Sequence, residues 1–573
     1  MPSLLKRWQI AQKISPSADD ALKSYHPILR QVLFNRGHAT LLEAQAFLEA
    51  KPLSNTDPFQ MKGMQVAVER IETALREQEL IIIYGDYDVD GVTATALLVK
   101  FLEALGAQVR GYIPNRFEEG YGVNKDALTT LQSQGVHLVI TVDCGIRSLP
   151  EAGHARMLGV DLVITDHHQP SADLPVAVAI VNPKQPGDAY PDKDLAGVGL
   201  AYKLADALLQ HLRNCSFPVP PNLKVEDYLD LVALGTVADL APLVGENRSM
   251  VRAGLEAIRA CKRQGIHSLM GVAGVDPLKV MATDIGFILG PRLNAAGRLE
   301  SALASLELLT TQSLDQAGLL AQQLDNQNRE RQAITRQMQT LAEKMALAED
   351  PESLLLMATH PDFNPGVVGL AASRLTDAYY RPAIVAFQGD EFTRGSCRSI
   401  PEFHITEALD QCEDLLEHHG GHAAAAGFTV RNEKLPELLA RLREIAREKL
   451  SPLSLSPTLH ADAEVSLSDL KSSLLEALEG LQPTGYGNPQ PVFISRNLRV
   501  SYPKAVGKDS AHLKLTVTDG WITFDAIAFR QGHWLGRLPE RIDLLYTFEK
   551  NEFNGRSSLQ LNVRDIKPAE MPN

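Results

Sequence analysis

The chain has few cysteines and few aromatic residues for its length. Five of its 573 residues are cysteine, and Phe, Trp and Tyr together make up 6%. The cysteines lie far apart and form no CxxC pair, which excludes a disulfide scaffold and argues against a cysteine zinc site. Their odd number and wide spacing are typical of a reducing compartment, so we expect a cytoplasmic protein.

Long hydrophobic runs are also missing. No stretch approaches the roughly 18 consecutive apolar residues of a membrane span. The first residues lack the apolar region and the small-residue cleavage site of a secretory signal. We therefore expect neither membrane association nor secretion. The overall composition, 45% hydrophobic and 22% charged, is that of a globular protein. Its length allows three or four domains of ~100–200 residues.

Positive charge is scarce over most of the chain. The net charge of −14 argues against nucleic-acid binding by the whole surface. Residues 484–573 differ, because they carry 12 Lys and Arg against 9 Asp and Glu, a net charge of +3. This contrast indicates a separate C-terminal module and leaves room for a local basic groove.

Short apolar runs alternate with helix-like segments after residue 75. Strands are predicted at residues 80–84 (LIIIY), 109–113, 138–142, 162–165 and 176–181, and a helix at 94–105. This alternation predicts βαβ units and a parallel sheet. Ligands of such sheets bind at the carboxyl ends of the strands, so the residues that follow each strand are candidates for a site.

The rest of the chain divides by composition. We predict a helical region at 1–75, an α/β domain at 76–300, a connecting helix within 301–350, a second α/β domain at 351–450 and a β-barrel at 451–573. The long helix is expected over 314–347, which contains one glycine and no proline. Short strands such as LKLTVTD and IDLLYTFE, with turn signals between them, predict the barrel.

Three aspartates follow the first predicted strand. Asp86, Asp88 and Asp90 alternate within GDYDVDG. Carboxylates this close together repel one another and require a cation, and their hard oxygen atoms suit Mg²⁺ or Mn²⁺. The alternatives are a solvated turn and a calcium loop, but the EF-hand pattern fails because no Glu stands at its twelfth position.

Further candidate ligands follow the later strands. Asp143 stands in VDCG, and His167 and His168 stand in TDHH. A His pair taken alone is more often structural, and Asp239 in GTVAD could equally cap a helix. Because three strand ends converge on one sheet edge, however, the set favours a two-metal site. Such sites hold ions ~3.5–4 Å apart and clamp the oxygens of a phosphodiester.

Glycine and arginine occur together in four other segments. These are residues 114–116 (PNR), 290–298 (GPRLNAAGR), 394–399 (RGSCRS) and 420–422 (GGH). Glycine lets the backbone approach a phosphate, and arginine can bind one with two parallel hydrogen bonds. Each segment could also be an ordinary loop with a surface side chain.

Together, these motifs resemble the DHH phosphoesterase superfamily. GDYDVDG, VDCG, TDHH and GTVAD stand in the order typical of that superfamily, and GGHAAAAGF resembles its DHH-associated domain. GPRLNAAGRL, the long helix and the barrel narrow the resemblance to the RecJ family. The resemblance spans about residues 75–570. It implies an α/β fold with a parallel-sheet DHH catalytic domain, a long connecting helix, a second α/β DHH-associated domain and a C-terminal OB-like β-barrel.

The resemblance also implies residue roles. The expected ligands of two Mn²⁺ or Mg²⁺ ions are Asp88, Asp90, Asp143, His167 and Asp239, with Asp86 and His168 as further catalytic residues. The expected phosphate-binding residues are Arg292, Asn294, Arg298, Ser396 and Arg398, with Arg116 and His422 near the scissile group.

Two positions depart from the family pattern. Tyr84 stands where some relatives have a metal-binding His, so we expect one metal to be held more weakly. Cys397 lies within the predicted phosphate loop and is expected to make that loop sensitive to oxidation.

The implied activity is 5′→3′ hydrolysis of single-stranded DNA to 5′-mononucleotides in recombination and repair. Implied partners are single-stranded DNA, single-strand-binding protein and a RecQ-type helicase. One rival is a superfamily enzyme for short oligonucleotides or cyclic dinucleotides, which usually lacks a barrel. Another is a non-catalytic DNA-binding relative, which would have lost the acidic ligands. Candidates for base stacking, with barrel core as the alternative, are Trp521, Phe524, Phe529 and Trp534.

Overall fold

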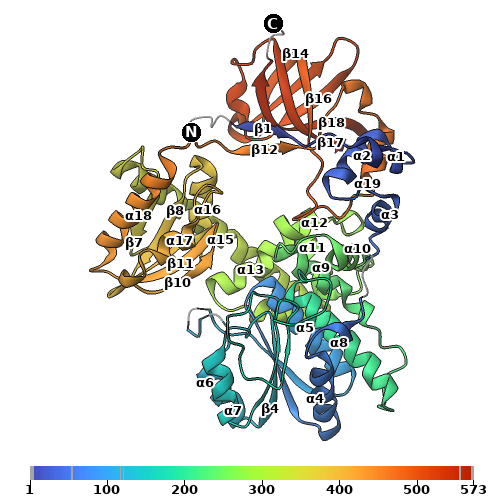
Figure 1. Ribbon diagram of the computed structural model, residues 1–573, viewed down its shortest axis with the longest axis vertical. Helices are drawn as coiled ribbons and strands as arrows, with labels where there is room; N and C mark the ends of the chain where they lie inside the picture. The colour runs from blue at the N-terminus through green and yellow to red at the C-terminus, as the bar shows by residue number, and fades with distance from the viewer. Residues whose placement is uncertain (1–5, 53–55, 117, 121, 554–555, 570–573) are drawn as a thin grey trace. The chain divides into compact units, whose positions relative to one another are not determined.

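The computed structural model describes residues 6–52, 56–116, 118–120, 122–553 and 556–569, which form two compact units (Figure 1). One unit contains residues 6–7, 294–301 and 322–459. The other contains the described residues of 8–293, 302–321 and 460–569. The two predicted α/β regions therefore fall into different units, whereas the first α/β region and the barrel share one.

A five-stranded parallel sheet forms the centre of the first α/β region. Its strands are β2 (Leu80–Gly85), β3 (Gln108–Tyr112), β4 (Val136–Val142), β5 (Asp161–Thr165) and β6 (Ala179–Val181). The side chains of Ile81, Ile82 and Ile83 are all buried, as expected for a parallel sheet covered on both faces. The five predicted strands are confirmed, although the last is shorter than predicted.

The order of the strands is β3-β2-β4-β5-β6. The chain passes from β2 outward to β3 and then returns across β2 to β4. The loops after β2 and β4 therefore diverge, and open parallel sheets bind ligands at such a switch point. Asp86 follows β2 and Asp143 follows β4 at this point.

Helices surround this sheet and extend beyond it. They are α4 (Met64–Glu77), α5 (Val89–Ala104), α6 (Lys125–Ser133), α7 (Leu149–Met157), α8 (Gly197–Asn214), α9 (Leu229–Ala238), α10 (Gly245–Arg259), α11 (Gln264–Ala273), α12 (Ala282–Asp284), α13 (Gly290–Leu299) and α14 (Leu303–Thr310). Helix α5 begins five residues before its predicted start and is buried almost all round, because it packs against α8, α9 and β3.

One glycine- and arginine-rich segment is helical rather than a loop. It forms α13, and Gly290 allows this helix to pack closely against its neighbours. A Cβ atom at Gly290 would lie 2.9 Å from the Ile285 carbonyl oxygen and 3.3 Å from the Ala238 Cβ. Glycine therefore lets α13 approach the end of α9, directly before Asp239.

The second α/β region has a mixed sheet of order β10-β11-β9-β8-β7. Its elements are β7 (Leu356–His360), α16 (Val368–Tyr379), β8 (Ala383–Gln388), β9 (Phe392–Arg398), α17 (Ile405–Asp410), β10 (Leu416–His422), β11 (Ala425–Arg431) and α18 (Leu435–Leu450). Helix α16 and the long helix α15 (Leu314–Glu349) pack on one face, and α17 and α18 pack on the other. The predicted long helix is confirmed.

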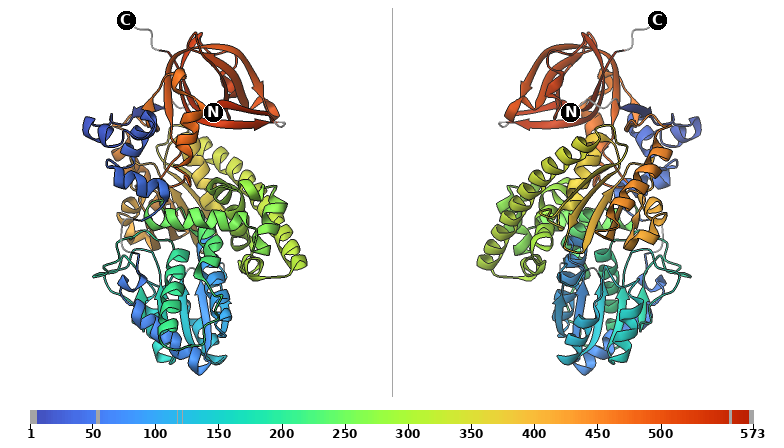
Figure 2. Two further views of the ribbon diagram at one scale, coloured as in Figure 1. Left: turned by 90° about the vertical axis from the view of Figure 1, so that its right-hand side faces the viewer. Right: turned by 90° about the vertical axis from the view of Figure 1, so that its left-hand side faces the viewer.

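A closed barrel follows, which confirms the prediction for the C-terminal region. Its elements are β13 (Ala463–Glu464), α19 (Ser472–Glu479), β14 (Phe493–Val506), β15 (His512–Thr518), β16 (Thr523–Ala528), β17 (Arg541–Phe553) and β18 (Arg556–Pro568). The short strand β12 (Thr458–Ala461) precedes them and belongs to a different sheet. Strand β14 pairs with both β15 and β17, so the order β14-β15-β16-β18-β17 closes on itself (Figure 2). Bulges in β14 allow the bending that two partners require.

The N-terminal helices pack beside this barrel. After the short strand β1 (Arg7–Ile10) come α1 (Pro16–Ala21), α2 (Pro27–Asn35) and α3 (Leu41–Glu49). Leu33 and Phe47 belong to the same hydrophobic core as Leu474 of α19 and Phe493 of β14. Helix α4 instead packs against α8 and β6. The N-terminal stretch is therefore mainly helical, but it divides between two cores.

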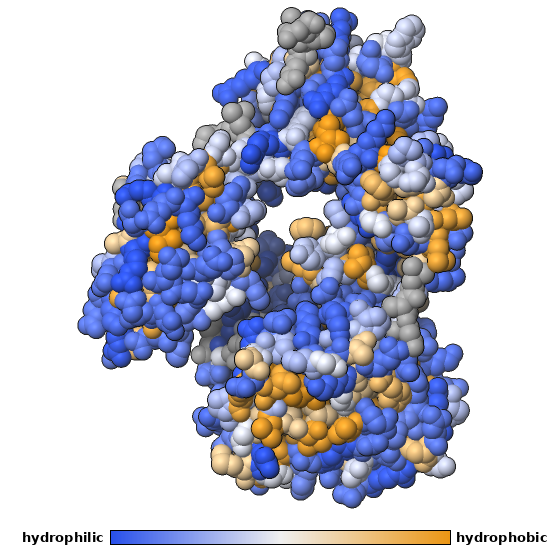
Figure 3. All heavy atoms as spheres, in the orientation of Figure 1, coloured by the Kyte–Doolittle hydropathy of each residue, from blue (hydrophilic) through white to orange (hydrophobic). Residues whose placement is uncertain are grey.

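The surface is largely hydrophilic on the face that Figure 3 displays. Within the described part of the chain, no helix is both long and apolar enough to cross a membrane.

A buried guanidinium group on α10 connects the first α/β region with the N-terminal helices and with the segment that leads into the barrel. Arg248 donates hydrogen bonds of 2.8 to 3.0 Å to the carbonyl oxygens of Phe47, Gly480, Leu481, Gln482 and Pro483. Its Cζ atom also lies 4.1 Å from the centroid of the Phe47 ring. Burial lowers the pKa of Arg248 to about 10, so it remains charged at neutral pH.

Replacing Arg248 tests this anchor. Arg248→Ala removes five hydrogen bonds to backbone carbonyl groups and the contact with the Phe47 ring, so the free energy of unfolding should fall by at least about 3 kcal/mol. The readout is the midpoint of thermal unfolding in calorimetry. Arg252→Ala is the matched control, because Arg252 on the same helix donates one hydrogen bond, to the Leu48 carbonyl oxygen. Equal midpoints for the two variants would contradict the anchoring role.

Candidate active site

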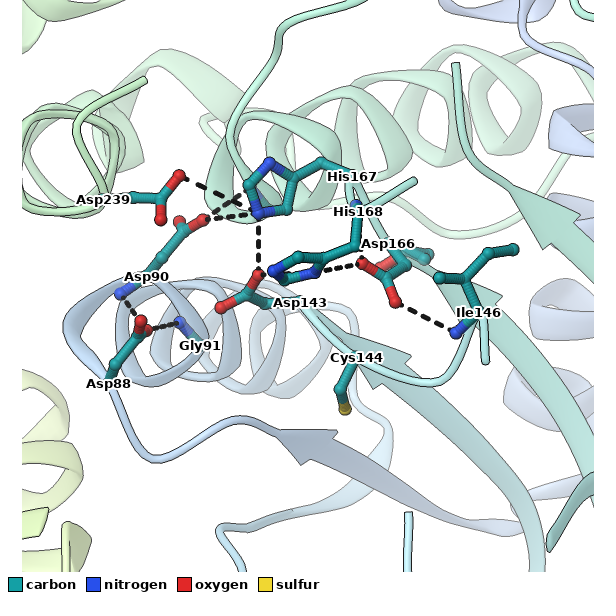
Figure 4. A network of polar contacts seen from close by, with 12 residues as sticks. Asp88, Asp90, Gly91, Asp143, Cys144, Ile146, Asp166, His167, His168 and Asp239 are labelled. Atoms are coloured by element: carbon teal, nitrogen blue, oxygen red, sulfur yellow. Dashed lines mark hydrogen bonds and ion pairs between the residues drawn. The ribbon is translucent and has the colours of Figure 1, made fainter. Parts of the chain in front are cut away.

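Carboxylates and imidazoles gather at the carboxyl edge of the parallel sheet (Figure 4). Asp88 begins α5 as its N-cap, and its Oδ1 accepts hydrogen bonds from the backbone N–H of Asp90 (2.9 Å) and Gly91 (3.1 Å). This cap turns the chain from strand into helix immediately after β2. It therefore places Asp90 in the first helical turn.

Asp90 is fully buried and is held by the N-terminus of α8. Its Oδ2 accepts from the backbone N–H of Gly197 at 2.6 Å, and its Oδ1 accepts from that of Val198 at 2.8 Å. The positive end of the helix dipole stabilises the carboxylate. A Cβ atom at Gly197 would lie 2.7 Å from the Asp143 Cβ. Glycine is thus needed for the close approach of α8 to the acidic cluster.

Asp143 and His167 lie at the centre of the cluster. Asp143 has a left-handed backbone conformation (φ 61°), of a kind that clusters at functional sites. The Nε2 atom of His167 lies 3.0 Å from Asp143 Oδ1, 3.8 Å from Asp239 Oδ2 and 3.9 Å from Asp90 Oδ2. Asp239 reaches the cluster from the C-terminal end of α9. Residues from three strand ends and two helices therefore meet at one point.

Asp166 orients the second histidine. Its Oδ1 lies 2.7 Å from His168 Nδ1, and its Oδ2 accepts from the backbone N–H of Ile146 at 2.9 Å. Burial alone would lower the pKa of His168, but the hydrogen bond and charge of Asp166 raise it. Sequence reasoning assigned Asp166 no role, although its place after β5 in TDHH was a usable signal.

Burial makes this cluster electrostatically unfavourable. It raises the pKa of Asp90 to about 7 and that of Asp239 to about 9, and neighbouring carboxylates add repulsion. Burial and like charges also raise the pKa values of Asp86 and Asp143 well above the ordinary range. Burial lowers the pKa of His167 to about 3, so this imidazole is neutral and can act as a metal ligand.

The atoms of the cluster fit divalent metal ions. Asp86 Oδ1, Asp143 Oδ1 and His167 Nε2 are buried and form no well-aligned hydrogen bond with any described residue, although Asp143 Oδ1 and His167 Nε2 lie 3.0 Å apart. Three overlapping groups each offer three ligand atoms within 4.8 Å of one another. They are Asp86, Asp88 and Asp143; Asp143, His167 and His168; and Asp90, His167 and Asp239. Carboxylate oxygens with one imidazole suit Mn²⁺ or Mg²⁺. The donor set therefore fits divalent ions of this kind.

Comparison with known proteins identifies the family. Residues 80–236 match the DHH family N-terminal domain, 352–448 the DHHA1 domain and 461–565 the RecJ OB domain. The single-stranded-DNA-specific exonuclease RecJ of Bacillus subtilis strain 168 is 39% identical over 98% of this chain and 71% of its own length. The chain belongs to the RecJ family.

Solved RecJ structures agree with this assignment. RecJ of Thermus thermophilus in complex with Mn²⁺ is 30% identical, with a TM-score of 0.84 over 99% of this chain and 80% of that chain. The complex of the same protein with Mg²⁺ has a TM-score of 0.78 at 29% identity, over 99% of this chain and 79% of that chain. The predicted fold class is thereby confirmed.

Tyr84, which the sequence analysis singled out as a departure from the family pattern, belongs to the core. Its side chain is buried, its hydroxyl donates to the Gly122 carbonyl oxygen at 3.2 Å, and its ring stacks on Tyr112. Weaker retention of one metal remains a prediction.

The predicted RecJ phosphate loop is a strand. Ser396 and Arg398 lie on β9, where alternate residues share one face. A Cβ atom at Gly369, in the first turn of α16, would lie 3.5 Å from Ser396 Oγ and 3.1 Å from the Arg398 Nη2. Cys397 points to the opposite face and is fully buried in the core, which raises its pKa to about 12. The expected oxidation sensitivity is therefore wrong, because this thiol is shielded and protonated.

The other predicted substrate residues are spread over the chain. Arg116 places its guanidinium 5.1 Å from the Tyr87 ring, and Arg292 Nη1 donates to the Ile288 carbonyl oxygen at 2.8 Å. Asn294 and Arg298 lie on α13, and His422 lies at the end of β10. These last three belong to the unit that contains β9, whereas the acidic cluster lies wholly in the other unit.

The raised carboxyl pKa values predict a pH dependence for the metal-free protein. Asp90 and Asp239 titrate near 7 and 9 when folded, against an ordinary value of 3.8, so the folded state binds protons that the unfolded state releases. The free energy of unfolding should therefore fall as pH rises from about 4 to 9, by up to about 1.4 kcal/mol per pH unit for each group.

Thermal unfolding in chelator across this pH range measures the effect. Asp239→Asn should make stability fall less steeply with pH, because one titrating group is removed. Added Mn²⁺ should reduce the same slope in the unsubstituted chain. Asp173→Asn, at an exposed acid of the same domain, should leave it unchanged. An identical slope for Asp239→Asn and the unsubstituted chain would contradict the assignment.

Proposed function

We propose that this chain is a metal-dependent exonuclease that degrades single-stranded DNA from its 5′ end to 5′-mononucleotides. The observation that carries the proposal is the buried cluster of acids and imidazoles in a chain of the RecJ family. The 5′→3′ direction and the mononucleotide product are taken from the family resemblance. A role in recombination and repair, in the cytoplasm, is proposed on the same ground.

The proposed metal ligands are Asp88, Asp90, Asp143, His167 and Asp239, with Asp86 and His168 beside them. Two bound Mn²⁺ or Mg²⁺ ions would lower the pKa of a water molecule and neutralise charge on the scissile phosphate. The protein's own contribution is orientation, because α8 holds Asp90 and Asp166 holds His168. The raised pKa of His168 favours its protonated form, which would stabilise negative charge that develops on the phosphate.

The barrel favours a long single strand over a dinucleotide. Single-strand-binding barrels combine basic groups with aromatic rings that stack on bases. Trp521 is 95% exposed and Phe529 is 53% exposed, so both are proposed to stack on bases. Phe524 and Trp534, also predicted as candidates, pack in or against the barrel core. We further propose the boundaries predicted from sequence as the domain limits, and single-strand-binding protein and a RecQ-type helicase as partners.

We propose that Ser396 and Arg398 receive the 5′-terminal phosphate. They share one face of β9 beside the first turn of α16, and Gly369 leaves room for both. Backbone N–H groups at a helix N-terminus favour an anion, and arginine adds a bidentate donor. Arg116, Arg292, Asn294, Arg298 and His422 are proposed as further contacts to substrate phosphates.

End-labelled strands test the function directly. With Mn²⁺, a 5′-labelled single strand should yield labelled mononucleotide at once, whereas a 3′-labelled strand should shorten progressively, and duplex should resist. Asp143→Ala should lower the rate by more than about 100-fold while DNA binding survives. Asp173→Ala is the control, since that acid is exposed and outside the cluster. Mononucleotide release from the 3′ end would overturn the polarity.

Arg398→Ala tests end recognition. A lost charge-assisted hydrogen bond costs about 1.5–3 kcal/mol, so turnover on 5′-phosphorylated strands should fall about 10- to 100-fold, and less on 5′-hydroxyl strands. Arg447→Ala, at an exposed position on α18 of the same region, should leave both rates unchanged. Equal losses on both substrates by a folded Arg398→Ala protein would contradict the role.

A further inference from the structure

A second cluster of metal-ligand side chains lies away from the acidic cluster. His211 Nε2 is 2.7 Å from Glu72 Oε2, and Cys215 Sγ is 3.3 Å from Glu72 Oε1. One ligand atom from each residue lies within 4.8 Å of the other two. Glu72 and His211 stand 139 residues apart in the chain, so no sequence motif reveals the group.

Two packed helices bring these residues together. Glu72 lies on α4, His211 lies in the last turn of α8, and Cys215 caps α8. The backbone N–H of Cys215 donates to the His211 carbonyl oxygen at 3.1 Å, which keeps both side chains on one side of the helix end. All three residues are partly buried, so solvent can still reach the group.

The chemistry of the donors selects a particular ion. A thiolate, an imidazole and a carboxylate suit Zn²⁺, whereas Mg²⁺ and Ca²⁺ prefer oxygen ligands alone. In a tetrahedral site with bonds of about 2.0–2.3 Å, ligand atoms stand roughly 3.4 Å apart. The ligand atoms of this group lie within 4.8 Å of one another, so small side-chain movements bring them to that spacing.

We propose that Glu72, His211 and Cys215 form a zinc site that fastens α4 to the C-terminal end of α8. Zn²⁺ takes Glu72 Oε2, His211 Nε2 and Cys215 Sγ, with water as the fourth ligand. The thiol proton leaves to solvent, and His211 binds as a neutral imidazole with its remaining proton on Nδ1.

Arg76 supports this arrangement. It lies one turn after Glu72, and its Nη2 donates to the Cys215 carbonyl oxygen at 3.2 Å and lies 2.7 Å from Glu72 Oε1. Arg76 therefore binds Glu72 Oε1, the carboxylate oxygen that is not proposed as a zinc ligand. Hydrogen-bonded carboxylate ligands of this kind are oriented for metal binding.

The site is distinct from the acidic cluster but acts on the same helix. The N-terminus of α8 holds Asp90, and the zinc site lies at its other end. At 1.5 Å per residue, the 18 residues of α8 separate the two ends by about 27 Å. Zinc would therefore stabilise the helix that positions a proposed catalytic ligand without touching the substrate.

Cobalt substitution of the full-length protein tests the proposal. A cysteine ligand gives Co²⁺ a sulfur-to-metal charge-transfer absorption, and none of the ligands proposed in the acidic cluster is cysteine. The unsubstituted chain should show the band, and Cys215→Ser should lose it. Cys261→Ser should retain it, since Cys261 is also partly buried but lies outside the group. Absence of the band in the unsubstituted chain, or its retention in Cys215→Ser, would overturn the site.

A second variant separates metal binding from folding. His211→Gln keeps the thiol but should also lose the band and bind about one Zn²⁺ fewer per chain. Zn²⁺ should raise the thermal midpoint of the unsubstituted chain and of Cys261→Ser, but not of the two site variants. An equal rise in all four proteins would refute the site. Both site variants should retain nuclease activity with Mn²⁺, which separates this inference from the proposed function.

Discussion

Carboxylates that are buried together, away from water, require positive charge nearby. The first α/β region is built to meet that requirement. Asp90 and Asp143 are buried within reach of one imidazole, His167, which burial keeps neutral. The fixed compensation comes from the N-terminus of α8, whose backbone donors stabilise Asp90. That compensation is partial, because the pKa of Asp90 remains raised. A protein built this way is complete only when cations join the carboxylates.

The scaffold of this cluster also supports the rest of its unit. Helix α10 packs against α9, which ends at Asp239, and α10 carries Arg248. Through Arg248, the segment that leads into the barrel and the N-terminal helices are fastened to the catalytic scaffold by hydrogen bonds to backbone carbonyls. Every residue supplies a backbone carbonyl group, whatever its side chain. This connection therefore depends on the side chain of the buried arginine and not on the identity of the residues that it contacts. Disturbing it should therefore loosen the barrel before it disturbs the acidic cluster.

Sequence reasoning succeeded where a local pattern determines the structure. The β-branched run of β2 and the acids behind it predicted both a parallel strand and the gathering of acidic side chains at its carboxyl end. It failed where tertiary contacts decide: α13 contains two glycines yet is helical, because Gly290 packs against α9, and β9 is a strand because β8 and β11 pair with it. Arg248 and the group around Glu72 were missed because their partners are distant in sequence. Roles of single site residues remain predictions.

The division into two units separates chemistry from the proposed recognition of the strand end. The acidic cluster draws all its residues from one unit, and Ser396 and Arg398 lie in the other. Sites with no shared partners respond independently to substitution, so metal affinity should not depend on Arg398. Contacts made away from the reacting atoms can raise turnover rather than affinity alone. A folded Arg398 variant with lower turnover and unchanged metal affinity would therefore show that Arg398 acts on the substrate and not on the metal ions.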